Sequence, residues 1–276
     1  HNEICSLLYL GIKAFEEIGN DIVQTASFVI RNSSLSDYTG TYLKLLTHDR
    51  QEKEKGCLLR SNCSECRQKS FLKIPGAPIS FWVSENFRNA FSEKSFNDFA
   101  DIRSGMSTTD NERFLRYWYE PVYQNINFIC HSLEEAKESP LRWYPYNKGG
   151  DYRKWYGNNS LVVNWLNDGA EIKKWVVSNP KDPKTTSWSR RIFGTDCFFK
   201  EGITWSSIAS SQFGCRCYGT GYIFDSGANG LFPFNITQKY YLAGLLNSKV
   251  SKMVLDVINP SINFGPGTIG KIPAII

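Results

Sequence analysis

Helical periodicity occurs near both ends of the 276-residue chain. Residues 3–18 place apolar side chains three and four positions apart and predict a first helix, which Gly19-Asn20 closes. Residues 240–257 (YYLAGLLNSKVSKMVLDV) carry the same spacing with greater regularity and predict the strongest helix of the chain, ended by Asn259-Pro260. Shorter helices are predicted at 79–91 and 170–177.

Runs rich in β-branched and aromatic residues predict strands between these helices. Residues 22–31 (IVQTASFVIR) indicate a buried strand, and residues 41–47 (TYLKLLT) a second strand after a polar turn. Later strands are predicted at 161–165, 198–205, 213–218 and 221–225. Short strands, irregular loops and a late helix are typical of an α+β domain, which we place at residues 76–276.

The first 75 residues have a different pattern. A helix, a buried strand, a turn and another strand cannot bury both faces of a sheet alone, so residues 1–50 are predicted to be the closing part of an α/β domain whose larger part lies upstream. The charge run at 49–55 (DRQEKEK) favours a solvated linker or helix face. Residues 51–75 are therefore predicted to be a charged linker.

Residues 141–158 (LRWYPYNKGGDYRKWYGN) interleave six aromatic rings with four cations around Gly149-Gly150. Cations neutralise phosphates, rings stack on exposed bases, and adjacent glycines let the backbone approach closely, so this composition suits a surface that binds a polyanion. An aromatic hairpin with its rings in the core and its charges in solvent accounts for the composition equally well.

The distribution of charge points the same way. The chain carries a formal net charge of +5, and residues 142–201 alone hold eleven Lys/Arg against six Asp/Glu. The whole excess thus lies in one segment, which indicates an acidic partner on one face, although so small an excess also arises by chance.

Cysteines suggest one candidate metal site. Cys57, Cys63 and Cys66, with His48 nearby, could supply four zinc ligands. No second C-x-x-C or His pair follows at a finger spacing, so ordinary reduced cysteines are favoured and no metal is predicted. Eight cysteines in a chain of this size are also too scattered for a disulfide framework.

Familiar catalytic constellations are missing from the sequence. It contains no H-E-x-x-H, G-x-S-x-G or phosphate-binding glycine loop, and its carboxylates are not clustered as a two-metal nuclease requires. We therefore expect no self-contained active site. The chain also lacks an apolar run of membrane-spanning length and a signal pattern, which predicts a cytoplasmic protein without a membrane partner.

Seven phrases occur in this order along the chain: KAFEEIGNDIVQTASFVIRN (13–32), FLKIPGAPISFWVSENF (71–87), IRSGMSTTDNERFLRYWYE (102–120), RWYPYNKGGDYRKWYGN (142–158), FFKEGITWSSIAS (198–210), GYIFD (221–225) and LAGLLNSKVSKMVLDVINPSINFGPGTIGKIPAII (242–276). Together they resemble the region downstream of the catalytic motif in large adenine-specific DNA methyltransferases, the enzymes of type IIG restriction–modification and BREX phage-defence systems.

The resemblance implies a division of roles. Residues 1–47 resemble the last strands of the S-adenosylmethionine-dependent methyltransferase fold, and residues from about 76 onward resemble a region that reads the DNA sequence. GITWSSIAS and INFGPGTIGKIPAII also resemble recognition domains of type I specificity subunits. The Asn-Pro-Pro-Tyr motif and the cofactor-binding glycine loop are absent from the sequence. S-adenosylmethionine is thus implied only for a full-length enzyme with an N-terminal methyltransferase domain, with or without a nuclease, and this chain is not expected to methylate DNA alone.

Double-stranded DNA is the partner that the resemblance implies. Arg153, Lys154, Arg190 and Arg191 suit phosphate contacts or bidentate guanine contacts, and Asn111, Asn147 and Gln212 suit adenine edges. By the same resemblance, Asn20 and Asp21 would line the edge of the target-base cleft; a helix stop and turn is the simpler alternative. The predicted DNA-binding residues are Thr109, Asn111, Arg113, Arg142, Asn147, Lys148, Tyr152, Arg153, Lys154, Trp155, Arg190 and Arg191.

A second hypothesis places the same residues at a protein interface. Tyr, Trp and Arg are enriched in protein–protein contacts, so residues 141–158 could instead dock a partner of a defence or restriction complex. DNA binding weakens steeply with salt, whereas a mainly apolar interface does not, and this difference separates the two.

Overall fold

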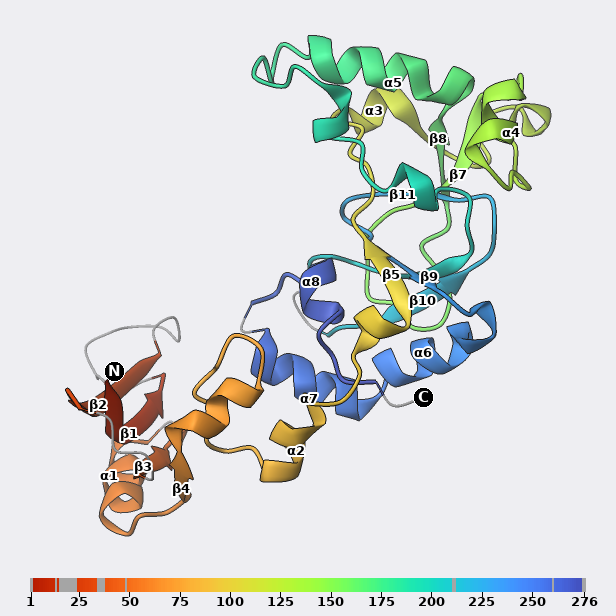
Figure 1. Ribbon diagram of the computed structural model, residues 1–276. Helices are drawn as coiled ribbons and strands as arrows, with labels where there is room; N and C mark the ends of the chain where they lie inside the picture. Colours follow the sequence, from red (N-terminus) through yellow and green to blue (C-terminus); the bar gives the residue numbers. More distant parts are fainter. Residues whose placement is uncertain are drawn as a thin grey trace. The chain divides into compact units, whose positions relative to one another are not determined.

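A computed structural model describes residues 2–12, 14, 24–33, 38–47, 49–209, 212–259 and 261–274 of the chain. The chain forms two compact units, His1–Glu93 and Lys94–Ile276. Each unit combines short strands with short helices, so the protein is of the mixed α+β class, as the sequence predicts (Figure 1).

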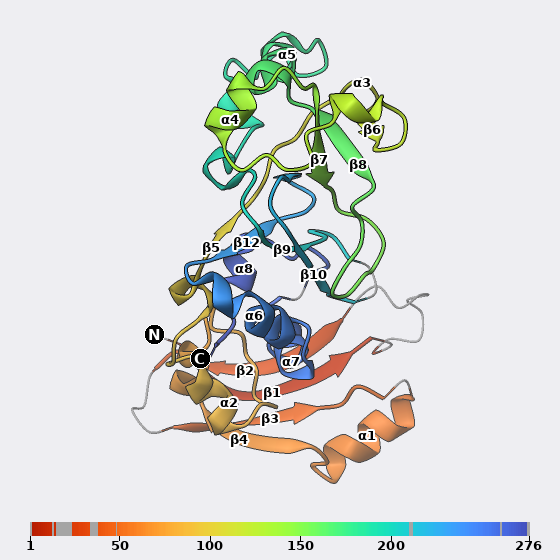
Figure 2. The same ribbon diagram turned by 90° about the vertical axis from the view of Figure 1, so that its right-hand side faces the viewer.

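The first unit is built on one four-stranded sheet in the order β2-β1-β3-β4 (Figure 2). β1 pairs antiparallel with β2 and parallel with β3, and β4 pairs antiparallel with β3. A small core of Leu7, Tyr42, Phe71 and Phe81 lies against the sheet. The elements are β1 (Glu3–Gly11), β2 (Thr25–Arg31), β3 (Thr39–Lys44), α1 (Arg50–Leu58), β4 (Cys63–Arg67) and α2 (Glu85–Ala90).

The helix predicted at residues 3–18 is wrong, because β1 occupies residues 3–11. Its contiguous run Leu7-Leu8-Tyr9-Leu10 is as compatible with a strand as with a helix, and neighbours on both sides pair with its backbone. Residues 15–23 lie outside the described part of the chain. The strand predicted at 22–31 is confirmed as β2, but it is exposed rather than buried, with Phe28 and Val29 each 58% exposed.

Residues 51–75 belong to the first unit and are not a linker. The charge run forms α1, whose N-terminus is capped by the Asp49 carboxylate accepting from the backbone N–H groups of Gln51 and Glu52. The following residues form β4, which adds a fourth strand to the sheet beside β3. The charges therefore lie on a helix face, which was the other prediction for this run.

The second unit contains two four-stranded sheets, ordered β11-β7-β8-β6 and β10-β9-β12-β5. In Figure 1, α3, α4 and α5 lie around the first sheet, and α6, α7 and α8 around the second. The first group comprises α3 (Asn111–Phe114), β6 (Leu115–Tyr117), α4 (Leu133–Glu138), β7 (Trp143–Asn147), β8 (Leu161–Asn164), α5 (Leu166–Ser178) and β11 (Ile223–Phe224). The second comprises β5 (Ala100–Arg103), β9 (Gly202–Trp205), β10 (Cys215–Tyr218), β12 (Gly230–Pro233), α6 (Lys239–Leu246), α7 (Lys249–Ile258) and α8 (Pro266–Ile269).

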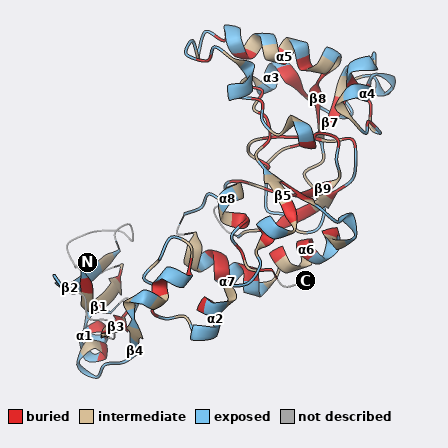
Figure 3. Cartoon of the chain, viewed as in Figure 1, coloured by how far each residue is buried: buried red, intermediate tan, exposed pale blue. Residues whose placement is uncertain are grey.

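Aromatic side chains dominate the core of the second unit. Trp165, Phe198, Phe199 and Phe224 are fully or almost fully buried, and neighbouring rings meet edge-on or tilted at centroid distances of 5.4–6.4 Å. Figure 3 shows the buried residues concentrated along the strands of this unit. The strands predicted at 161–165, 198–205, 213–218 and 221–225 each contain an observed strand.

The single helix predicted at 240–257 is two helices, α6 and α7. The break lies at Asn247-Ser248, where Ser248 caps α7 by accepting from the backbone N–H of Ser251. The Asn247 side chain turns to β10, donating to the Cys215 carbonyl and accepting from its N–H, both at 3.0 Å. A long-range contact thus ends α6 where local periodicity predicts continuation. The helix predicted at 79–91 is likewise shorter, because α2 begins only after its cap Ser84.

Candidate nucleic-acid interface

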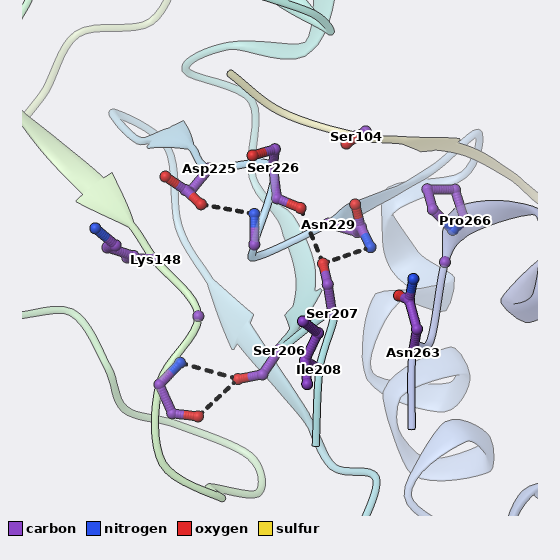
Figure 4. A pocket seen from close by; sticks show the side chains of 14 residues that line it. Ser104, Lys148, Ser206, Ser207, Ile208, Asp225, Ser226, Asn229, Asn263 and Pro266 are labelled. Carbon is purple, nitrogen blue, oxygen red and sulfur yellow. Dashed lines mark hydrogen bonds between the residues drawn. The ribbon is translucent and has the colours of Figure 1, made fainter. Parts of the chain in front are cut away.

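Strand ends from both sheets of the second unit meet at a cavity of about 680 Å³ (Figure 4). In Figure 4, Lys148 lies on one side of this cavity and Asn263 with Pro266 on the other, with Ser206 and Ser207 between them. Most of its lining residues are Ser, Asn or Gly, whose hydroxyl, amide and backbone groups can form hydrogen bonds with a ligand. The lining residues are Ser104, Lys148, Gly149, Gly150, Ser206, Ser207, Ile208, Asp225, Ser226, Gly227, Asn229, Asn263, Gly265 and Pro266.

Asp225, the carboxylate of this cavity, is fixed from two directions. The Tyr146 hydroxyl donates to its Oδ2 at 2.6 Å, and the Gly227 N–H donates to its Oδ1 at 2.6 Å. Burial raises the pKa of the Tyr146 hydroxyl well above its usual value, and the charge of Asp225 raises it further, so Tyr146 remains a donor. The carboxylate is therefore held in one orientation beside the cavity.

Hydrogen bonds also fix the wall formed by residues 205–207. Ser207 Oγ donates to the Ser226 carbonyl and accepts from Asn229 Nδ2, both at 2.9 Å. Trp205 Nε1 donates to the Phe264 carbonyl at 2.7 Å, and the Phe264 N–H donates to the Ser207 carbonyl at 2.7 Å. These bonds join β9 to the segment before α8, so the polar groups of the wall are preorganised.

Gly149 is required by a close approach of two backbone segments. A Cβ atom at this position would lie 2.3 Å from the Gly227 carbonyl oxygen, closer than atoms can come. Next to it, Gly150 exchanges two hydrogen bonds with the Ser206 hydroxyl, at 3.1 and 2.9 Å. The glycine pair thus brings residues 148–150 against β9 and the turn after β11.

The aromatic and basic stretch 141–158 divides into two parts. Tyr144 and Tyr146 lie on β7 and are fully buried, as the core-hairpin alternative requires. Tyr152, Trp155 and Tyr156 follow in the loop and are 43%, 55% and 72% exposed. Only the second part therefore presents rings to a partner.

A second cavity of about 270 Å³ adjoins the first and shares Gly150, Ser206 and Ile208 with it. Tyr152, Arg153 and Gln212, which the sequence analysis singled out, line this cavity together with the buried Arg216. Lys148 at the first cavity and Arg153 at the second form no ion pair with any carboxylate of the described residues. Both cations are thus available to an anionic partner.

Two other predicted cations share one carboxylate. Glu171 binds Arg113 at 2.9 Å and Arg142 at 3.2 Å, and it also accepts from Asn164 Nδ2 at 2.9 Å. The hydrogen bond from Arg113 lowers the pKa of Glu171, and the bond from Asn164 and the charge of Arg142 lower it further. Arg113 and Arg142 therefore form a cluster separate from the two cavities.

Replacing Glu171 by Gln tests this cluster through acid stability. A carboxylate with a depressed pKa stabilises the fold above its unfolded pKa, about 4.3, and loses that contribution as the pH falls through the folded pKa. We expect the variant to be less stable at pH 7 by under about 1 kcal/mol, since the pair is partly exposed, and the difference in stability to become smaller as the pH falls towards 3. Melting temperatures from pH 3 to 7 measure this, and a constant difference across the range would contradict it.

The remaining predicted residues lie in varied settings. Arg191 pairs with Asp182 at 2.5 Å, and the neighbouring Arg190 is exposed. Asn111 is exposed and accepts from the Thr108 hydroxyl at 2.8 Å, and Thr109 next to it has a φ of 59°. Lys154 Nζ donates to the Asn247 carbonyl at 3.1 Å, which gives it a structural contact.

The predictions for Asn147 and for the pair Asn20 and Asp21 have different outcomes. Asn147 is 1% exposed, so no base edge reaches it in this conformation, which argues against the predicted adenine contact. Asn20 and Asp21 lie outside the described residues. The prediction that they line the cleft edge stays a prediction.

Sequence reasoning missed several groups that line the first cavity, namely Ser206, Ser207, Asp225, Asn229 and Asn263. A signal was present for three of them. Ser206 and Ser207 follow the strand predicted at 198–205, Asp225 is the last residue of the strand predicted at 221–225, and polar residues at strand ends often form binding sites. Asn229 and Asn263 carry no such local signal.

The candidate zinc ligands are not arranged as a binding knuckle. Cys63 and Cys66 both lie on β4, and side chains three positions apart on a strand point to opposite faces. Cys57 lies on α1, and His48 is outside the described residues.

None of the helices in the described part of the chain has both the length and the apolar character needed to cross a membrane.

Comparison with known proteins identifies homologues along almost the whole chain. It is 34% identical to the adenine-specific methyltransferase PglX of Lacticaseibacillus casei (strain Zhang) and 30% identical to the adenine-specific methyltransferase BrxX of Escherichia coli O9:H4 (strain HS), with 98% of this chain covered in both cases. The chain is homologous to one region of these adenine-specific methyltransferases. It spans 23% and 21% of their lengths, respectively. No family model matches the chain. The resemblance stated from the sequence is thereby confirmed.

The phrases that carry this resemblance come together in space. Five of the seven, at 102–120, 142–158, 198–210, 221–225 and 242–276, each contribute residues to the 680 Å³ cavity. Segments that are distant in the sequence thus build one site.

Proposed function

We propose that this chain is the region of an N6-adenine DNA methyltransferase that recognises double-stranded DNA by sequence. The observation that carries the proposal is the cavity built from five of the segments on which the resemblance rests and lined by hydrogen-bonding groups, with Lys148 at its side. A methyltransferase must hold the duplex in register while its target base is extruded. Register requires phosphate contacts, and sequence recognition requires donors and acceptors at base edges.

The exposed loop after Gly150 supports the same function. Arg153 supplies a cation, and Tyr152, Trp155 and Tyr156 supply exposed rings within four residues of it. Cations neutralise phosphates, and exposed rings add contacts to sugars and bases. A polar cavity beside a basic aromatic loop thus combines the two kinds of contact that sequence-specific binding needs.

The proposal assigns DNA recognition to residues from 76 onward, most of which lie in the unit Lys94–Ile276, and assigns residues 1–50 to the end of a methyltransferase fold. S-adenosylmethionine and the target adenine would then be bound by parts of the enzyme outside this chain. DNA is the only partner that the proposal needs for this region.

Replacing Lys148 and Arg153 together by Ala tests the proposal. We choose Lys148 rather than Lys154, because Lys154 also bonds the Asn247 carbonyl and its loss would change stability. Each phosphate contact that is lost should flatten the plot of log affinity against log salt by about 0.9, and two should flatten it by about 1.8. Filter binding of duplex DNA at several salt concentrations, with the full-length protein, measures the slope.

Lys137→Ala is the matched control, because Lys137 is exposed on α4, which contributes to neither cavity. Its slope should equal that of the wild type. If the wild type binds duplexes without a steep salt dependence, or does not bind them, the docking hypothesis replaces DNA recognition.

A further inference from the structure

The 270 Å³ cavity contains a buried cation without a counter-charge. Arg216 lies on β10, is 2% exposed and lines this cavity. None of the described carboxylates forms an ion pair with it. Its Nε and Nη2 atoms are shielded from solvent and have no hydrogen-bond partner among the described residues.

Position on the sheet explains why Arg216 cannot reach bulk water. Its neighbours Cys215 and Cys217 point to the opposite face of β10, where the Cys215 thiol donates to the Ala243 carbonyl of α6. Arg216 shares its face with Thr204, its direct partner on β9, and with Tyr218. Thr204 Oγ1 and the Tyr218 hydroxyl are also buried without a partner among the described residues. This face therefore offers hydrogen-bond donors that the described protein groups do not satisfy.

Burying an unpaired guanidinium costs folding free energy unless a ligand compensates its charge. A buried guanidinium that lacks both solvent and a counter-charge destabilises the fold, and burial lowers the pKa of Arg216 accordingly. Arg216 lines the cavity, and a guanidinium is the cation best suited to hydrogen-bond the oxygen atoms of a phosphate. We propose that the cavity lined by Arg216 is the receptor for a single phosphate group of the DNA backbone.

The rest of the lining fits a phosphodiester better than a base edge. A neutral guanine edge would leave the charge of Arg216 uncompensated, whereas a phosphate compensates it. Arg153 and Gln212 add polar groups to the lining, and Arg153 and Tyr152 are exposed and can meet a DNA strand. Asp151 is the one carboxylate among the lining residues, and it is exposed to solvent. The inference rests on the proposed function, since it takes DNA as the source of the phosphate.

Arg216→Met in the full-length protein is the deciding variant, because Met has a similar length and no charge. We expect its melting temperature to equal or exceed that of the wild type, since a buried unpaired charge is removed. Its affinity for all duplexes should fall about ten- to a hundred-fold, as a charge-assisted contact is lost, and its salt slope should flatten by about 0.9. Arg116→Met is the matched control, because Arg116 Nη1 donates to the Glu112 and Leu115 carbonyls; this variant should lose stability and keep the slope.

Inorganic phosphate gives a second readout that does not depend on DNA. At constant ionic strength, replacing chloride by phosphate should raise the melting temperature of the wild type and leave that of Arg216→Met unchanged. If phosphate does not raise the melting temperature of the wild type, and Arg216→Met melts at a lower temperature than the wild type, then Arg216 is a structural residue and the inference is overturned. Loss of affinity confined to one DNA sequence, with an unchanged slope, would overturn it in favour of a guanine contact. If the wild type binds no DNA, the proposed function fails, while the phosphate shift still decides whether the receptor exists.

Discussion

Replacing Trp205 by Ala should lower the free energy of unfolding by about 3–5 kcal/mol, which is the usual cost of deleting a large buried ring. Trp205 is fully buried on β9. Its Nε1 also donates to the Phe264 carbonyl, so the substitution leaves that acceptor without its partner and releases the wall that Asn263 and Gly265 form. For a unit of this size the melting temperature should fall by roughly 6–20 °C.

Trp155→Ala is the natural comparison for this prediction. The same ring is deleted, but Trp155 is 55% exposed, so the melting temperature should stay nearly constant while DNA affinity decreases. Thermal unfolding followed by circular dichroism measures both variants. If the two lose similar stability, the assignment of one ring to the core and the other to the binding surface is wrong.

Asn247→Ala is expected to have the next largest effect on stability, about 2–4 kcal/mol. The substitution removes both hydrogen bonds to Cys215 and leaves the buried backbone N–H of Cys215 without the Asn247 acceptor. The helix content should not rise, because Ser248 still caps α7. Chemical denaturation gives the free energy, and far-ultraviolet circular dichroism gives the helix content.

Asn259→Ala serves as the control for Asn247, because Asn259 also ends a helix, but its side chain bonds only to Ser261 among the residues that the structure describes. It should cost less than about 1 kcal/mol. An equal loss in both variants would mean that the contact with β10 adds nothing, and the break between α6 and α7 would then need another cause.

Sequence patterns predicted four of the eight strands described in the second unit, β8, β9, β10 and β11, because those strands carry their own signal. Residues 161–165 (LVVNW) and 221–225 (GYIFD) are mainly apolar, β-branched or aromatic. The helix prediction for residues 3–18 was wrong for the opposite reason. Their apolar spacing permits a helix, and the choice of a strand depends on pairing with residues 25–31 and 39–44, which local periodicity does not contain.

The candidate site was harder to predict than the fold, because its residues come from positions 104 to 266. The sequence singled out Gly149-Gly150 for a close approach of the backbone to a polyanion, which stays a prediction, and the structure brings Gly149 against the Gly227 carbonyl of the same chain. It gave no reason to expect Arg216 in the interior, since arginine is almost always exposed. Burial of Arg216 follows from the strand register that pairs it with Thr204, which is a property of the folded sheet.

The exposed edge of strand β2 favours self-association of the protein. Among the described strands β2 has one hydrogen-bonded neighbour, and its other edge carries unpaired backbone groups next to the exposed side chains of Phe28, Val29 and Ile30. An apolar edge of this kind is a template for adding another strand, from the same chain or from a second molecule. Self-association through β2, and not unfolding, is therefore the first difficulty to expect when the protein is concentrated, and a strand that covered this edge would turn a four-stranded sheet into a five-stranded one.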